Sequence, residues 1–265
     1  NPLTETWRNI GFARNDRTVF QSIIGISWFW LYGALLLAQI PVFAKNVLGG
    51  NEGAVTLLLG VFTVGVGLGS ILCEKFSGRR VEIGLLTFGA IGLTLFGFDL
   101  FLASPSALPD GAPLPVFTLL SFPPTWRLLV DLLALGVFGS FFVVPLYVLI
   151  QSRSDPVHRA RIIAANNILN ALFMVAGALT AAGLLGLGVS IPTLFGIAAL
   201  CNTLVVFCTW RLVPEYFLRL LAGMLIHIAY RLDTRDLDHI PEEGPAVLIC
   251  NHVSFVDAIV LMAAV

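Results

Sequence analysis

The sequence predicts an all-α membrane protein, and three observations carry this prediction. Hydrophobic residues make up 57% of the 265 residues and charged residues only 12%, about half the charged fraction of an ordinary soluble domain. The mean hydropathy is +0.91. Lys, Arg, Asp and Glu are absent from five long runs of the chain. These features exclude a water-soluble enzyme.

The charge-free runs cover residues 18–44, 53–73, 83–98, 132–152 and 162–210. A spanning helix needs about 20 apolar residues, and the third run reaches that length only if Asp99 lies near a membrane face. The last run is too long for one helix and contains a turn signal at 186–192, with Gly, Ser and Pro. We therefore expect six spanning helices, at about 19–43, 54–74, 82–103, 129–150, 162–186 and 190–211.

Basic residues are distributed unevenly between the two ends of these helices. Only Lys45 and Arg127 fall at one end, and the other 13 of the 15 Lys and Arg residues fall at the opposite end. Because Lys and Arg favour the cytoplasmic side, both chain ends are expected in the cytoplasm and the proline-rich loop 104–127 outside. The 16 acidic residues balance the basic ones, which gives no support for a nucleic-acid partner. The four Cys have neither metal-site nor disulfide-framework spacing.

The chain changes character after Arg211. After Pro214, the stretch from Glu215 to Arg231 is apolar apart from a narrow basic stripe of Arg219, His227 and Arg231, which favours a helix lying at the membrane interface. A polar loop begins at Asp233. It leads into a short apolar run, 246–251, that we interpret as a buried strand, and residues 254–265 are expected to form a helix.

Polar and aromatic side chains gather on one face of two predicted spans. The first span carries Gln21, Trp28, Tyr32 and Gln39, and the fifth carries Asn166, Asn167 and Asn170. Such faces should point toward protein or water, because lipid cannot satisfy their hydrogen bonds. Two interpretations are open: these side chains line a transport cavity, or they hold helices together.

The loop between the second and third spans, 74–82, places Glu74 and Lys75 before Gly78, followed by Arg79 and Arg80. It resembles the loop signature of the major facilitator superfamily, with one additional residue between Lys75 and Gly78. The resemblance implies that these four charged residues form a conformational latch. Six helices with cytoplasmic ends resemble the C-terminal half of such a transporter, and the opening residues, 1–8, resemble the central loop of the lysophospholipid transporters.

The tail carries the most specific motif, Asn-His-x4-Asp at 251–257, after a Gly-Pro and an apolar run. It resembles the first block of the glycerophospholipid acyltransferases. An imidazole can take the proton of a hydroxyl that attacks a thioester, and a carboxylate can orient that imidazole. His252 and Asp257 have the required spacing. The alternative is that Ser254 and Asp257 form a helix capping box and His252 is a surface residue.

These resemblances divide the chain into a cytoplasmic central loop (1–17), six transmembrane helices (18–212), an interfacial linker helix (213–232) and the truncated start of an acyltransferase domain (233–265). They imply a fragment of a bacterial inner-membrane protein that transports lysophospholipids and re-acylates them. An acyltransferase that uses the helices only as an anchor, and a transporter of an unrelated solute, are the alternatives.

Several further expectations follow from the same resemblances. The acyl donor would be acyl-ACP or acyl-CoA, and neither a metal nor a cofactor is expected. The partners would be membrane lipids, the lysophospholipid substrate, acyl carrier protein and the other transporter half in the same parent chain. The fragment itself is expected to be inactive as an acyltransferase, because the acceptor-phosphate site would lie beyond Val265.

The uneven distribution of basic residues predicts the topology directly. With six spans and cytoplasmic ends, a cysteine introduced at Ala112 should react with an impermeant thiol reagent added outside intact cells. Labelling at this position only from the inside would contradict the prediction.

Overall fold

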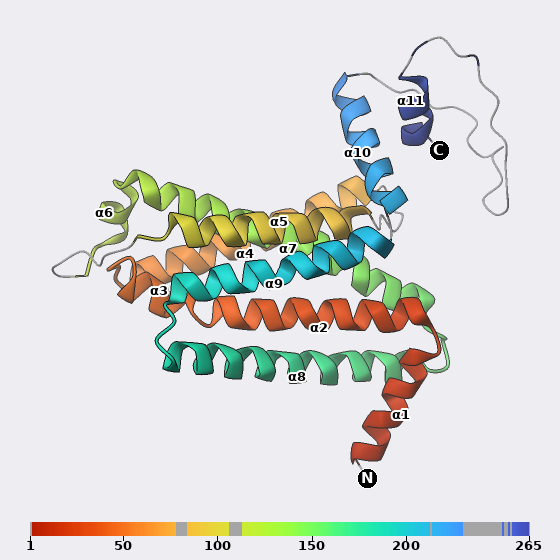
Figure 1. Ribbon diagram of the computed structural model, residues 1–265, viewed down its shortest axis with the longest axis horizontal. Coiled ribbons are helices and arrows are strands. Elements are labelled where there is room, and N and C mark those ends of the chain that lie inside the picture. Colours follow the sequence, from red (N-terminus) through yellow and green to blue (C-terminus); the bar gives the residue numbers. More distant parts are fainter. Residues whose placement is uncertain are drawn as a thin grey trace.

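The computed structural model describes residues 2–77, 84–105, 113–212, 214–229, 251, 254 and 256–264, and the regular elements among them are helices (Figure 1). The described part contains no strand, only an isolated bridge between Gly50 and Leu114. The helices are α1 (Pro2–Arg14), α2 (Arg17–Leu37), α3 (Ile40–Asn46), α4 (Glu52–Ser77), α5 (Gly84–Ala103), α6 (Val116–Leu120), α7 (Pro123–Arg153), α8 (Arg159–Gly186), α9 (Ile191–Leu212), α10 (Pro214–Ala229) and α11 (Asp257–Ala264).

Six helical segments among these residues are long and apolar enough to cross a membrane. They are Arg17–Asn46, Glu52–Ser77, Gly84–Ala103, Pro123–Arg153, Arg159–Gly186 and Ile191–Arg211. The predicted fold class, an all-α membrane protein with six spans, is therefore confirmed, and the chain is a multi-pass membrane protein.

Two spans differ from their predicted boundaries. The first is interrupted after Leu37 by a turn, and α3 begins again with Pro41 in its first turn, where the missing N–H of proline costs no helical hydrogen bond. The fourth begins at Pro123, not at 129, again with Pro in the first turn. The sequence prediction started this helix too late, because Arg127 interrupts the apolar pattern without breaking the helix.

Helix α7 is the centre of the bundle and contacts α2, α4 and α5. In the most apolar 18 residues of α7, 56% of the residues are buried. The corresponding share is 17% in α4 and 17% in α8. Helix α9 packs on α5, and α8 packs mainly on α2 and lies at the edge of the bundle (Figure 1). Helices α4 and α8 therefore keep most of their surface exposed.

Glycines allow α4 and α7 to approach closely. A Cβ on Gly65 would lie 2.2 Å from the carbonyl oxygen of Leu133, and one on Gly136 would lie 2.4 Å from that of Phe62. Contacts this short with backbone atoms leave no room for a methyl group. Small residues at helix contacts are the usual way for membrane helices to maximise packing.

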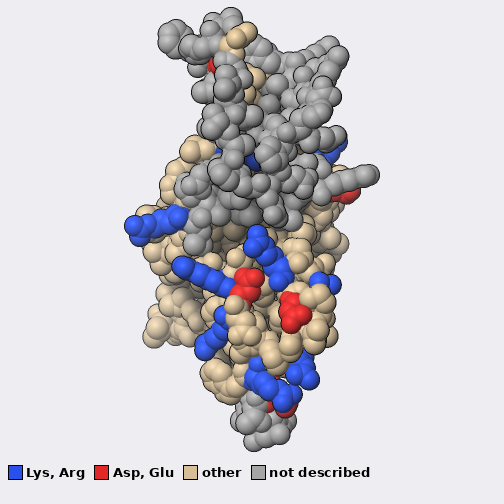
Figure 2. All heavy atoms as spheres, turned by 90° about the vertical axis from the view of Figure 1, so that its right-hand side faces the viewer, with Lys and Arg blue, Asp and Glu red and all other residues tan. Residues whose placement is uncertain are grey.

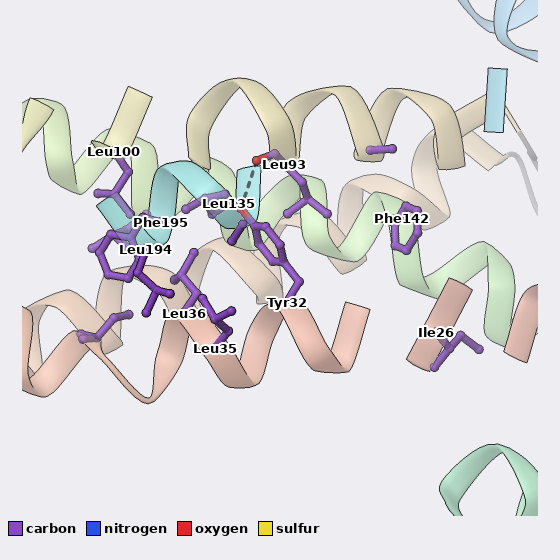
Figure 3. Close-up of a cluster of buried hydrophobic side chains, with 14 of the residues drawn as sticks. Ile26, Tyr32, Leu35, Leu36, Leu93, Leu100, Leu135, Phe142, Leu194 and Phe195 are labelled. Atoms are coloured by element: carbon purple, nitrogen blue, oxygen red, sulfur yellow. Dashed lines mark hydrogen bonds between the residues drawn. The ribbon is translucent and has the colours of Figure 1, made fainter. Parts of the chain in front are cut away.

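A continuous apolar core fills the space between the central helices. Figure 3 shows one part of it, where Leu35 and Leu36 of α2 face Leu100 of α5 and Phe195 of α9. Phe195 also packs against Phe43 of α3, with 5.4 Å between ring centroids. This contact fixes the short helix α3 against the rest of the bundle.

The two ends of the bundle differ in charge. We call the end that holds the start of α2, the end of α4 and the α7–α8 turn the basic end; Figure 2 looks onto it and shows Lys and Arg side chains spread over the surface. The opposite end, here the loop end, holds α3 and α6. Its described basic residues, Lys45 and Arg127, pair with Glu52 and Asp99 respectively.

Helix α10 extends from the basic end after α9 (Figure 1). It contacts α5, α9 and α11, and Leu220 packs on the small cluster of Cys73, Leu85 and Phe141. Its apolar part, Phe217–Ile226, is too short to span a membrane. The predicted linker helix is therefore present over Pro214–Ala229, and its interfacial position stays a prediction.

The close contact between α4 and α7 can be tested with two neighbouring glycines. Gly65→Ala should destabilise the protein by about 1–3 kcal/mol, because the new methyl group forces the helices apart. The unfolding midpoint in detergent measures the effect. Gly67→Ala is the matched control, since a Cβ added at Gly67 would have nothing within 4 Å. Equal midpoints for the two variants would contradict the packing argument.

Candidate functional site

A hydrogen-bonded network lies inside the bundle and centres on Asn202 of α9, which is fully buried. Its side-chain amide donates to the carbonyl oxygen of Ala90 at 2.9 Å and to Oγ1 of Thr94 at 3.0 Å, both on α5. Its Oδ1 accepts a hydrogen bond from Nε1 of Trp28 on α2, at 2.9 Å. One amide therefore connects three spanning helices.

A second interhelical contact joins α2 to α8. Ser27 Oγ donates to Oδ1 of Asn170 at 3.0 Å, and both residues are buried. Asn166, one turn earlier, is also buried, and its Oδ1 has no hydrogen-bond partner among the described residues. Asn167 is exposed, with its Oδ1 3.5 Å from Nδ2 of Asn166. The three amides of α8 thus occupy different environments.

The remaining polar residues of the first span lie at different depths. Tyr32 is buried, and its hydroxyl donates to the carbonyl oxygen of Leu93 at 3.2 Å (Figure 3). Gln21 and Gln39 are partly buried. The face that carries Trp28 and Tyr32 therefore points into the bundle, as the sequence pattern indicates.

In this arrangement Trp28, Tyr32 and Asn170 use their polar groups to bind other helices. That is the packing interpretation of the two polar faces. The unpartnered Oδ1 of Asn166 and the exposed side chain of Asn167 are left for a ligand or another segment to contact. The predicted role of Gln21, Trp28, Tyr32, Gln39, Asn166, Asn167 and Asn170 in lining a transport cavity stays a prediction.

Sequence reasoning missed Asn202 and Ser27. Neither belongs to a visible polar stripe: Asn202 follows Cys201 in an otherwise apolar segment, and Ser27 lies between Ile26 and Trp28. The signal that was available for Asn202 is a lone amide near the middle of a span, which is costly in lipid unless it is paired.

A charged cluster lies at the loop end. Nε of Arg127 donates to Oδ2 of Asp99 at 2.9 Å. Asp131, one turn further along α7, is 1% exposed, and its Oδ2 has no hydrogen-bond partner in the described part of the chain. Asp99, Arg127 and Asp131 therefore form a polar cluster at the loop end of the membrane-spanning bundle.

The predicted latch is only partly within the described residues. Glu74 and Lys75 lie exposed in the last turn of α4, whereas Arg79 and Arg80 lie outside the described residues. The latch therefore stays a prediction.

Of the predicted catalytic pair, His252 and Asp257, only Asp257 is among the described residues. Asp257 is the first residue of α11, and its Oδ2 accepts a hydrogen bond from the backbone N–H of Ser254 at 2.8 Å. The N–H of Val256 lies 3.4 Å from Oγ of Ser254. This geometry is that of a helix start, as the capping alternative requires. His252 and residues 246–250 of the predicted strand at 246–251 lie outside the described residues.

The network around Asn202 predicts a specific stability effect. Asn202→Leu leaves the indole N–H of Trp28 unpaired and removes both bonds to α5, so it should cost about 1–2 kcal/mol, the usual range for polar contacts between membrane helices. Thr203→Val is the matched control, because Thr203 is exposed and bonds only within its own helix, to Ala199. Unfolding midpoints in detergent compare the two, and an unchanged midpoint for Asn202→Leu would contradict the network.

Comparison with known proteins gives one result for the helical part and one for the tail. The chain is 32% identical over 146 residues to the lysophospholipid transporter LplT of Klebsiella pneumoniae. The aligned residues cover 53% of this chain and 30% of the relative. LplT of Cronobacter sakazakii is equally similar, over 52% of this chain and 30% of the relative. This chain therefore spans less than a third of the length of the curated relatives it matches.

The tail matches the family model described as Acyltransferase over residues 231–265. No solved structure matches the chain. Both resemblances drawn from the sequence are confirmed: this chain joins membrane helices similar to those of lysophospholipid transporters to the beginning of an acyltransferase segment.

Proposed function

We propose that this chain is part of a bacterial inner-membrane protein that moves lysophospholipids to the cytoplasmic leaflet and re-acylates them there. The observation that carries the proposal is the union in one chain of LplT-like helices and an acyltransferase segment. A transporter delivers a lysophospholipid, and the acyltransferase consumes it at the same membrane face. The proposal includes cytoplasmic locations for both chain ends and a further transporter half in the parent protein.

The buried polar groups support transport over a purely anchoring role. An anchor requires only apolar helices, whereas Asn166, Asn170 and Asn202 place three buried amides inside the bundle. Polar groups inside membrane proteins are expensive and usually mark function. The unpartnered oxygen of Asn166 and the exposed amide of Asn167 are the groups we assign to the substrate path, together with Gln21, Trp28, Tyr32, Gln39 and Asn170.

The acyl-transfer step follows from the chemistry of the tail. The lysophospholipid hydroxyl attacks the thioester carbonyl carbon of acyl-ACP or acyl-CoA, and His252 takes the hydroxyl proton. The tetrahedral intermediate then expels the thiolate, which is protonated, and an ester bond has replaced the thioester. Asp257 would hold the imidazole in the correct orientation, in addition to accepting the N–H of Ser254. No metal or organic cofactor is needed for this reaction.

The two activities are predicted to separate by mutation in the intact parent protein. His252→Ala should lower acyl transfer by about 10²–10⁴-fold, the usual contribution of a general base, and should leave lipid import unchanged. Asp257→Asn should lose less. Uptake of labelled lysophosphatidylethanolamine and its conversion to the two-chain lipid measure the two steps. Full acyl transfer in His252→Ala would contradict the catalytic assignment.

The transport assignment has its own test in the same assay. Asn170→Leu should reduce uptake more than it reduces protein abundance, because it removes a polar group from the proposed path and unpairs Ser27. Normal uptake by this variant would restrict the role of Asn170 to helix packing. Acyl transfer to lysophospholipid added from the cytoplasmic side provides the internal control, since that substrate needs no import.

A further inference from the structure

A pocket of about 290 Å³ opens at the basic end, where α1, the start of α2 and the α7–α8 turn meet. Its apolar wall comes from Phe12, Val19 and Ile162. The Phe12 ring stacks on the ring of His158 with 4.1 Å between centroids. Helix α1 therefore closes one side of the pocket and is held there by an aromatic contact.

The polar side of the pocket contains hydrogen-bond donors that have no partner among the described residues. Ser154 is 3% exposed, it lines the pocket, and its Oγ has no hydrogen-bond partner among the described residues. A buried polar group in this state costs about 1–3 kcal/mol. Arg153 lines the same pocket with an exposed side chain that makes no ion pair within the described part of the chain. The exposed amide of Asn15 lies beside them.

Two carboxylates, those of Asp16 and Asp155, line the same pocket. Asp16 accepts the N–H groups of Thr18 and Val19 through Oδ1, at 2.7 and 3.1 Å. Oδ2 of Asp155 lies 2.7 Å from Nδ1 of His158, and this contact lowers the pKa of the Asp155 carboxyl. Both carboxylates are therefore fixed in place, and Asp155 keeps its negative charge at neutral pH.

The combination of charges restricts what the pocket can hold. A compact anion with two negative charges would be repelled by the two carboxylates, because Arg153 is the one Arg or Lys among the residues that line the pocket. A simple cation would leave Arg153 and Ser154 without a partner. A ligand that carries an anionic oxygen group and a nearby ammonium satisfies both sides at once.

We propose that this pocket binds a zwitterionic head group in which a phosphate ester is joined to an ammonium group. The phosphate oxygens accept from Arg153, Ser154 and Asn15, and the ammonium faces Asp16 and Asp155. The volume is just below the range of about 300–1,000 Å³ that drug-sized ligands occupy, so it suits a head group and excludes a whole lipid.

This inference rests on the proposed function in one respect, since it takes a lysophospholipid as one source of the head group. The other source of the same chemistry is free phosphoethanolamine. The pocket lies at the basic end, from which α10 extends to contact α11 (Figure 1), and this position would make it a holding site for imported substrate.

The test is binding to the 265-residue chain in phosphatidylglycerol nanodiscs, which contain no amine lipid. Four probes are compared: phosphoethanolamine, lysophosphatidylethanolamine, inorganic phosphate and ethanolamine. We expect the two zwitterions to bind in competition with each other, and phosphate or ethanolamine alone to bind at least tenfold more weakly. Binding of the lysolipid only would identify the lipid as the source. Failure of both zwitterions to bind folded protein would overturn the inference.

Variants locate the binding to this pocket. Arg153→Gln and Ser154→Ala should each weaken zwitterion binding about tenfold or more, as expected for loss of a hydrogen bond to a charged group. Arg153 is exposed, so its replacement leaves the fold intact. Ser152→Ala is the matched control, because Ser152 lies at the same helix end and bonds to Val148 in its own helix at 2.8 Å. Unchanged binding in Arg153→Gln and Ser154→Ala would overturn the assignment.

The two proposals fail differently. If the parent protein imports no lysophospholipid but zwitterion binding still depends on Arg153 and Ser154, the proposed function is wrong and the pocket assignment stands. If import occurs and neither variant alters binding, the pocket assignment is wrong and the proposed function stands.

Discussion

An amide in the hydrocarbon region of a membrane must find its hydrogen-bond partners within the protein, and Asn202 meets this requirement by connecting three helices. Its bonds reach α5 through Ala90 and Thr94 and reach α2 through Trp28. Helix α9 is thereby fixed in rotation and in height, because a slide of one turn would break all three bonds. The apolar contacts around it, which have little directional preference, then need only to fill space.

The spans themselves could be predicted because a single property, the absence of charge over about 20 residues, decides membrane insertion. Helix contacts could not, because they depend on details that hydropathy does not contain. Small residues spaced like Gly65 and Gly69 are typical of close helix packing, but the sequence does not show which backbone each glycine approaches. In the structure Gly65 meets Leu133 and Gly136 meets Phe62, whereas a Cβ on Gly67 would meet nothing within 4 Å. The sequence pattern predicted the polar face of α2, but it did not predict Asn202 of α9, which binds Trp28 on that face.

The tail shows a different limit of sequence reasoning. The motif at 251–257 is specific enough to identify the acyltransferase segment, which the family match confirms. The same residues also satisfy the start of a helix, since Asp257 accepts the N–H of Ser254. Both roles use one carboxylate, and a carboxylate has two oxygens. Capping of α11 is therefore compatible with a catalytic role and holds Asp257 at a defined position.

The positive charge of the basic end has more than one cause, and separating the causes identifies the groups that remain for a ligand. The predicted cytoplasmic position of this end would account for its excess of Arg. Several of these side chains also pack on aromatic rings: Arg14 lies over Phe20, Arg161 over Phe12 and Arg211 over Phe207. Arg153 instead lines a pocket together with two carboxylates and the buried Ser154, whose hydroxyl has no hydrogen-bond partner among the described residues. The predicted topology explains why residue 153 is basic, but it does not explain the buried hydroxyl of Ser154 next to it. The proposed ligand, a phosphate ester with an adjacent ammonium, would give a partner to both Arg153 and Ser154.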